Sequence, residues 1–266
     1  MTETDAGFVE LAGRFAGAVQ ERLADLDAVV REGGLDPAIT LMVDSLRRGG
    51  VIQAFGTGHS QAFAMEIAGR AGGLIPTHPI ALRDLVLKGR RDASVLQGGT
   101  LERDGSIADE LWELYAFDPA DVFLIASNSG VNGSIVGLAL RAKAEGHPVI
   151  AVTSLEHTHA VTPKHPSGKR LAEIADVVID NRAPYGDTTL TLASPGGAGS
   201  AHGLGVGAVS SITAAYVAQL LTVGVAQRIA TTGEIPPLFI SANIPGGDEH
   251  NDTLKSRYGD RIGSLA

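Results

Sequence analysis

The stretches VIQAFGTGHS, at residues 51–60, and VFLIASNSG, at residues 122–130, decide the fold of this chain. In each, a short apolar run leads into a turn of small residues, and a helical pattern follows. Such a run is typical of a buried strand, and repeated strand–turn–helix units predict a parallel sheet. The carboxyl ends of parallel strands meet at one edge, so we expect the two turns to lie close together.

Both turns have the composition of an anion site. The first N–H groups of a helix lack partners within it, and the helix dipole favours negative charge there. Small residues let a phosphate approach the backbone, and hydroxyl groups add donors. The alternative is that the Ser and Asn side chains only cap the two helices. We expect binding by the loop residues Thr57, Gly58, His59, Ser60, Ser127, Asn128, Ser129 and Asn132.

The periodicity of apolar residues predicts the remaining elements. We expect helices at 6–31, 36–46, 60–71, 106–116, 133–145 and 206–230, and strands at 51–55, from 74, and at 121–126, 148–153 and 176–180, with 188–193 as one more candidate strand. Segments 83–108 and 194–205 read as loops, and the tail from 236 to 254 shows no periodicity. We therefore expect one domain, with a helical arm at 1–48, an α/β core at 49–231 and a tail at 232–266.

Composition excludes several classes of protein. The net charge of −9 argues against general nucleic-acid binding, and the absence of cysteine excludes disulfides and thiolate chemistry. The amino terminus does not have the pattern of a signal peptide, and the apolar stretches are interrupted by polar residues. We expect a cytoplasmic protein that binds neither a membrane nor nucleic acid.

The two loop motifs, in the forms VIQAFGTGHSQAFAMEIAGRAGGL at 51–74 and FLIASNSGVNGSIVGLALRAKAEGHPVIAVTS at 123–154, resemble the sugar isomerase (SIS) domain family. The block SANIPGGDEHN at 241–251 resembles a stand-alone subgroup of that family. This resemblance implies a three-layer αβα sandwich with a five-stranded parallel sheet, of flavodoxin-like type. It also implies a phosphosugar at the strand ends, and homodimers or homotetramers with sites near subunit boundaries.

Two carboxylates are candidates for acid–base work. Glu66 lies on the helix after the first loop, about 9 Å along the axis from Ser60 at 1.5 Å per residue. The stretch from Glu66 to Arg70 resembles a Glu-x-x-Gly-Arg stretch of heptose phosphate isomerases, in which that Glu is an acid/base; the alternative is an ordinary ion pair. Glu102, in a Gly-rich loop, resembles in position the second carboxylate of N-acetylmuramic acid 6-phosphate etherases; otherwise it is a solvated charge.

Other polar residues are weaker candidates. His250, in the tail, could reach the site of a neighbouring subunit as an acid/base, or could lie in a surface turn. The basic residues Arg83, Lys88, Arg90 and Arg91 could line the pocket or remain solvated. His157 and His159 suggest a solvated polar loop more than a metal site, so we expect neither a metal nor a cofactor.

We expect a lyase that eliminates water from an amino-sugar 6-phosphate such as N-acetylglucosamine 6-phosphate. Glu66, Glu102 and His250 are its predicted catalytic residues. The first loop has Gly-His-Ser where the etherases have a Ser-Gly-Arg stretch, which disfavours cleavage of a muramic ether. An aldose–ketose isomerase and a non-catalytic sugar-phosphate sensor remain alternatives.

Overall fold

The computed structural model describes residues 3–88, 91–192 and 203–263. Five parallel strands form the main sheet in the order β2-β1-β3-β4-β5. Their bounds are Thr77–Ile80 for β2, Ile52–Gly56 for β1, Val122–Ala126 for β3, Val149–Thr153 for β4 and Val177–Asp180 for β5. The predicted strand at Leu74 is instead a single bridge to Leu238, and β2 begins three residues later.

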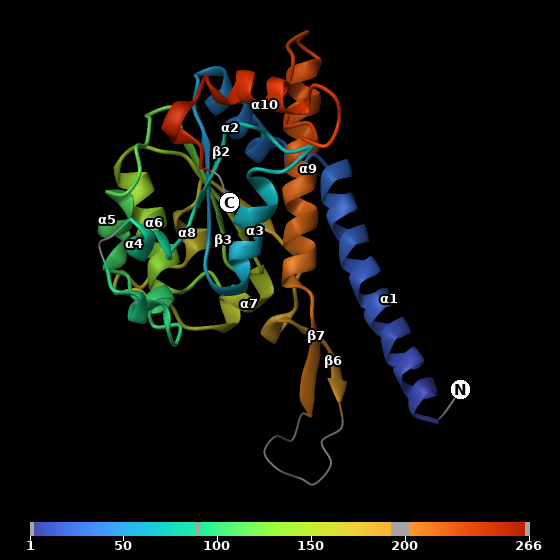
Figure 1. The fold of residues 1–266 in the computed structure, drawn as a ribbon. Coiled ribbons are helices and arrows are strands. Elements are labelled where there is room, and N and C mark those ends of the chain that lie inside the picture. The colour runs from blue at the N-terminus through green and yellow to red at the C-terminus, as the bar shows by residue number, and fades with distance from the viewer. Residues whose placement is uncertain (1–2, 89–90, 193–202, 264–266) are drawn as a thin grey trace.

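Helices cover both faces of this sheet, which confirms the three-layer α/β sandwich (Figure 1). One face packs against α1, α2, α3 and α9, and the other packs mainly against α5, α6 and α8. The helices are α1 Glu3–Arg31, α2 Asp36–Arg47, α3 Gln61–Ile67, α4 Asp84–Leu87, α5 Ile107–Trp112, α6 Gly133–Ala144, α7 Leu155–Ala160, α8 Leu171–Ile174, α9 Ser210–Ala230 and α10 Gly247–Lys255. Alternate residues of each strand enter the two cores, as the pleat requires.

A second, two-stranded antiparallel sheet projects from the carboxyl end of the main sheet (Figure 1). It consists of β6, Thr188–Leu192, and β7, Leu204–Ala208. The candidate strand at 188–193 thus exists, although it lies outside the main sheet. The expectation of a loop to residue 205 and a helix from 206 was wrong, because β7 occupies those positions and α9 begins at Ser210. Residues 194–202 of the predicted loop and residue 193 of the candidate strand lie outside the described residues.

The tail is more ordered than its sequence suggested. Residues 237–239 pair with the backbone of residues 72–75, just before β2, and α10 follows. Arg261 then donates to the backbone oxygen of Gly49 and to the carboxylate of Asp121, both at the amino ends of strands. The tail therefore covers the amino end of the sheet, the end opposite the two loops.

Helix α9 is long and apolar enough to cross a membrane by length and composition alone. In this fold it packs against α2 and α3, and the buried apolar side chains on one side of it, from Ala214 to Ile229, belong to the core. Helix α1 lies along α9 and extends toward the small sheet, where Phe15 contacts Gly207 (Figure 1). The amino-terminal part of α1 exposes Phe8 at 71% and Val9 at 57%.

Candidate functional site

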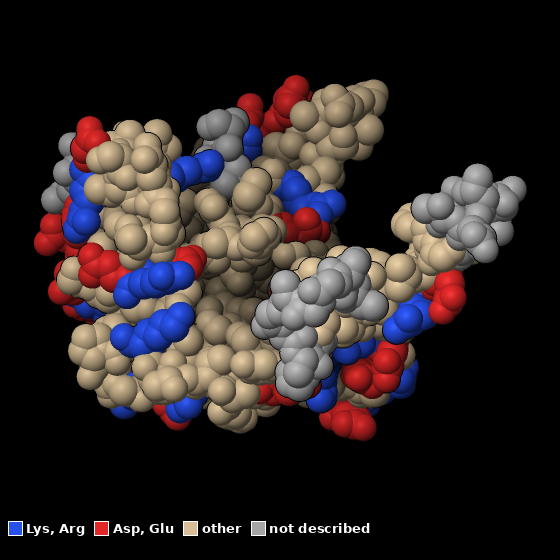
Figure 2. Space-filling model, turned by 90° about the horizontal axis from the view of Figure 1, so that it is seen from below, with Lys and Arg blue, Asp and Glu red and all other residues tan. Residues whose placement is uncertain are grey.

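The two loops lie side by side because their strands are neighbours. β1 and β3 pair in register, with Gly56 opposite Ala126, so both chains turn at the same level of the sheet. A shallow pocket joins Ser60 of the first loop to Ser127 and Asn128 of the second. Figure 2 looks onto this end of the molecule and shows a hollow lined mainly by uncharged residues, with both basic and acidic residues around it.

Three polar side chains of the loops do not form hydrogen bonds that cap the helices. Thr57 and Ser60 occupy N-cap positions of the first loop's helical turns, and Asn132 occupies the N-cap of α6, but none of the three makes a side-chain capping bond. Ser127 does shape its turn, since its hydroxyl oxygen accepts from the N–H of Gly130 at 3.1 Å. The serine can still donate its own proton, so this arrangement leaves donors for an anion.

The second loop is fixed by the neighbouring strand ends. The backbone oxygen of Asn128 accepts from the Ser154 N–H and from the Thr153 hydroxyl, both at 3.2 Å. The side-chain oxygen of Asn128 accepts from the amide of Asn181, which is 2% exposed and follows β5. Asn128 thus acts partly as a brace for the loop, while Ser129 beside it is half-buried.

The first loop depends on a glycine where strand meets helix. A Cβ on Gly56 would lie 2.2 Å from the backbone oxygen of Ser60, far inside contact distance. Only glycine lets the chain fold back so tightly on itself. Gly58 and His59 are exposed at the tip of this loop, and Thr57 is buried.

Glu102 lies beside the first loop, in a cavity of about 320 Å³ that Thr57, Gly58 and Arg83 also line. Its Oε2 atom is 3.0 Å from the position that a Cβ on Gly58 would take. The backbone at Glu102 is held to α6, since the Ser134 hydroxyl donates to the backbone oxygen of Glu102 at 2.7 Å. A half-buried carboxylate and an arginine therefore share one cavity at the carboxyl end of the sheet.

The other basic residues of that segment have different settings. Arg91 is paired with Glu110 at 2.6 Å, and the ammonium of Lys88 lies 3.9 Å from the centre of the Tyr115 ring. Arg90 lies outside the described residues. Among the described members of the basic run, Arg83 is the one that lines the cavity of Glu102.

Glu66 has a different environment from Glu102. Its carboxylate pairs with Arg70 and accepts from the side-chain amide of Gln219, on α9, at 2.7 Å. Glu66 is absent from the linings of the two cavities described above. Within one chain, Glu102 joins the loop residues and Glu66 faces the interface between α3 and α9.

His250 lies at the far end of the molecule from the loops. It belongs to α10, over the amino end of the sheet, and its Nε2 atom is 2.9 Å from the backbone oxygen of Leu238 (Figure 1). Contact between His250 and a site at the carboxyl end therefore requires a second copy of the chain.

Sequence reasoning missed the first turn of α9 as part of this region. Ser210 and Ser211 line the shallow pocket together with Ser60 and Ser127. Asp187 caps that turn, accepting from the N–H and the hydroxyl of Ser210 at 2.8 and 2.7 Å. The serine pair was a helix-start signal, but the helix was expected to begin four residues earlier.

Comparisons with known proteins agree with this architecture. Residues 14–154 match the family model described as SIS domain. A UPF0309 protein of Listeria monocytogenes is 35% identical over 248 residues, which are 93% of this chain and 97% of that protein. One from Halalkalibacterium halodurans is 33% identical over 258 residues, 97% of this chain and 99% of that protein. The solved structure of a phosphoheptose isomerase from Francisella tularensis matches with a TM-score of 0.52 at 16% identity, covering 85% of this chain and all of that one.

Proposed function

This chain belongs to the SIS-domain family and, within it, to the UPF0309 proteins, and from that premise we propose that it is a lyase that eliminates water from an amino-sugar 6-phosphate. The observation that carries the proposal is the half-buried carboxylate of Glu102 beside the paired loops, to which we assign the binding of the phosphate. N-acetylglucosamine 6-phosphate is the substrate that we propose. The reaction would take place in the cytoplasm.

The phosphate would lie among the hydroxyl groups at the loops. Ser60 and Ser211 lie at the starts of α3 and α9, Ser127 directly follows β3, and all three line one pocket. Backbone N–H groups at those starts favour an anion, and the serines add hydroxyl donors. Arg83, in the adjoining cavity, supplies a positive charge on the sugar side.

Glu102 would remove the proton from carbon two of the open-chain sugar. That carbon is beside the aldehyde, so the electrons left behind are delocalised onto the carbonyl oxygen as an enolate. They then form the bond between carbons two and three, and the bond from carbon three to its hydroxyl oxygen breaks. The hydroxyl leaves as water after receiving a proton, which Glu102 itself could return. Each step is redox-neutral.

Elimination is favoured over isomerisation by the different settings of the two glutamates. Glu102, which resembles an etherase carboxylate in position, lines the cavity beside the first loop. Glu66, which resembles the acid/base of heptose phosphate isomerases, is bound to Arg70 and Gln219. The carboxylate associated with eliminating enzymes is therefore the one beside the phosphate loops.

An aldose–ketose isomerase is the second candidate. It needs the same first proton transfer, after which the proton returns to carbon one. The likeness of the fold to a phosphoheptose isomerase supports this alternative at the level of architecture. In that case Glu66 would have to leave its present partners, or act in an assembled oligomer.

We also propose that the protein forms homo-oligomers. Apolar side chains are exposed along α1 and α9, among them Phe8, Val30, Ile212 and Val223. Such surfaces in soluble proteins commonly mark contacts with another chain. A partner copy would also be the route by which His250 could approach a site.

Product analysis tests the proposed function. The purified chain is incubated with hexose, N-acetylhexosamine and heptose phosphates, and the products are analysed by mass spectrometry. We expect N-acetylglucosamine 6-phosphate to become lighter by one water and to gain ultraviolet absorbance. Unchanged mass with a shifted retention time would replace the lyase by the isomerase. No conversion, with thermal stabilisation by a sugar phosphate, would favour a sensor.

A further inference from the structure

Another cavity, of about 270 Å³, lies at the amino end of the sheet, away from the phosphate loops. It is lined by Gln53 and His78 from neighbouring strands, by Lys88 and Tyr115, and by Asp260 and Arg261 of the tail. Gln53 and His78 are register partners on β1 and β2, so their side chains emerge on the same face of the sheet.

Several buried polar atoms in this lining have no hydrogen-bond partner within the described part of the chain. They are Gln53 Oε1, both ring nitrogens of His78 and Arg261 Nε. Gln53 is 1% exposed and His78 is 8% exposed, so bulk water does not cover them freely. Buried polar groups normally have partners, because an unpaired one is costly.

The chemistry of these atoms is well defined. The Gln53 amide nitrogen donates at 2.9 Å to the carboxylate of Asp121, which has no proton to offer in its ionised form. The unpaired atom of Gln53 is therefore the oxygen, an acceptor. Arg261 Nε carries an N–H and is therefore a donor, while the other two guanidinium nitrogens already donate to Gly49 and Asp121.

His78 adds one donor and one acceptor when its ring is neutral. Burial and the nearby Lys88 lower the pKa of His78 to about 4, so the ring is uncharged near neutral pH. The ring of Tyr115 stands edge-on to the imidazole, with centroids 5.1 Å apart, and gives the cavity an aromatic wall.

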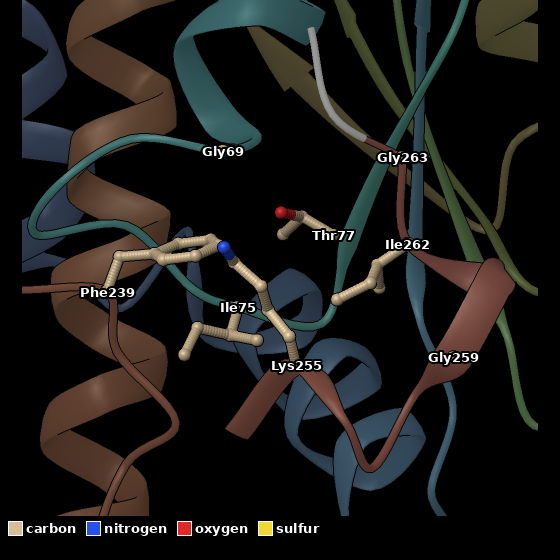
Figure 3. A pocket seen from close by; sticks show the side chains of 8 residues that line it. All are labelled: Gly69, Ile75, Thr77, Phe239, Lys255, Gly259, Ile262 and Gly263. Carbon is tan, nitrogen blue, oxygen red and sulfur yellow. The ribbon is translucent and has the colours of Figure 1, made fainter. Parts of the chain in front are cut away.

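The neighbouring cavity provides a contrast (Figure 3). It lies beside the same tail segment and has about 230 Å³, but its polar side chains have partners. The Thr77 hydroxyl donates to the Leu74 oxygen at 2.9 Å, and Lys255 lies near Asp252 and the Phe239 ring. Only the cavity of His78 and Gln53, of these two, combines space with unpaired buried polar atoms.

We infer that the cavity of Gln53, His78 and Arg261 is a binding site for a small neutral molecule that carries several hydroxyl groups. A hydroxyl both donates and accepts, so a few of them would satisfy two donors and two acceptors. A phosphate or carboxylate would place its oxygens against the Gln53 oxygen, and a metal ion would be repelled by Arg261 and Lys88. The volume is close to the lower limit for small-molecule pockets, about 300 Å³.

The inference does not depend on the proposed lyase activity. We would titrate the full-length protein with D-glucose, N-acetyl-D-glucosamine and myo-inositol, following the thermal unfolding temperature and the ¹⁵N resonances of the His78 ring. At least one of the three should raise the unfolding temperature and shift the ring resonances. His78→Leu should weaken binding of that probe at least about tenfold, a loss of roughly 1.4 kcal/mol.

Two further variants make the result specific. Ser127→Ala, at the carboxyl end, should leave the response to the neutral probe intact. Gln53→Leu provides a second test if His78→Leu does not fold. A cavity that holds only water would give no response to any of the three probes, which overturns the inference. A response that survives His78→Leu but is lost in Ser127→Ala would also overturn it, since the probes would then bind at the phosphate loops.

Discussion

Replacing Glu102 by Gln tests the proposed chemistry at its centre. The amide has the shape of the carboxylate and would lie at the same place beside Gly58, but it cannot accept a proton. In the parent, the carboxylate oxygen is 3.0 Å from the position that a Cβ on Gly58 would take. Positioned acid–base groups contribute about 10²–10⁴ in rate, so we expect the turnover number to fall by that factor, equivalent to roughly 2.7–5.5 kcal/mol. Affinity for the sugar phosphate should stay the same or rise, because one negative charge near the phosphate is removed.

The assay needs both turnover and binding. Turnover is followed by ultraviolet absorbance of the unsaturated product, and binding by titration calorimetry. Glu145→Gln is a matched control, since Glu145 lies on the surface in a pair with Arg141 and such pairs contribute at most about 1 kcal/mol. The reasoning would be refuted if Glu102→Gln kept turnover within about tenfold of the parent while folding normally.

Three other predictions concern backbone, pH and assembly. Gly56→Ala should lower the stability of the fold by about 1–3 kcal/mol and abolish ligand binding, because the added Cβ would meet the Ser60 backbone. Gly17→Ala is the control: it lies in open space on α1 and should raise the stability by about 0.5–1 kcal/mol. Thermal melts compare the two variants. His78 has a folded pKa of about 4, below its unfolded value of 6.5, so the unfolded chain takes up the proton first and the parent should lose roughly 3 kcal/mol of stability relative to His78→Leu as the pH falls from about 6.5 to 4. Urea titrations of both proteins measure this difference, and pH profiles that stay parallel would contradict it. Phe8→Glu should shift the oligomer toward monomers in analytical ultracentrifugation, and an unchanged mass would exclude that face as the contact.

The sequence was sufficient for four of the five strands of the central sheet, because their signals are local, whereas β2 was expected three residues too early. The apolar runs at β1 and β3 are buried on both faces, which is typical of parallel strands covered by helices. Small residues at the strand ends then fixed where the chain turns. The pairing of the two loops followed from topology alone, so this part of the site could be predicted without coordinates.

The small sheet could not be read in the same way. β7 has the sequence LGVGA, and most of its residues are exposed. Glycines in a strand weaken the local signal, and an exposed strand lacks the alternation that burial imposes. As a result, the predicted start of α9 was wrong, and Ser210 and Ser211 were missed as residues that line the pocket of the candidate site.

Helix α10 is stabilised by contacts distant in the sequence. Its sequence, GDEHNDTLK, is polar, and Asn251 fixes it by bonding both backbone groups of Ile240. The position of Glu66 illustrates a related limit. Periodicity predicted the distance of Glu66 along the helix from Ser60. It could not predict the partner of Glu66 on α9, Gln219, which is 153 residues away in the chain.

The most direct test of the account is a crystal structure of the Glu102→Gln variant with N-acetylglucosamine 6-phosphate. We predict the phosphate among Ser60, Ser127 and Ser211, with carbon two of the sugar facing residue 102. A phosphate bound anywhere else, or a sugar whose reacting carbons face away from residue 102, would contradict the site that we propose.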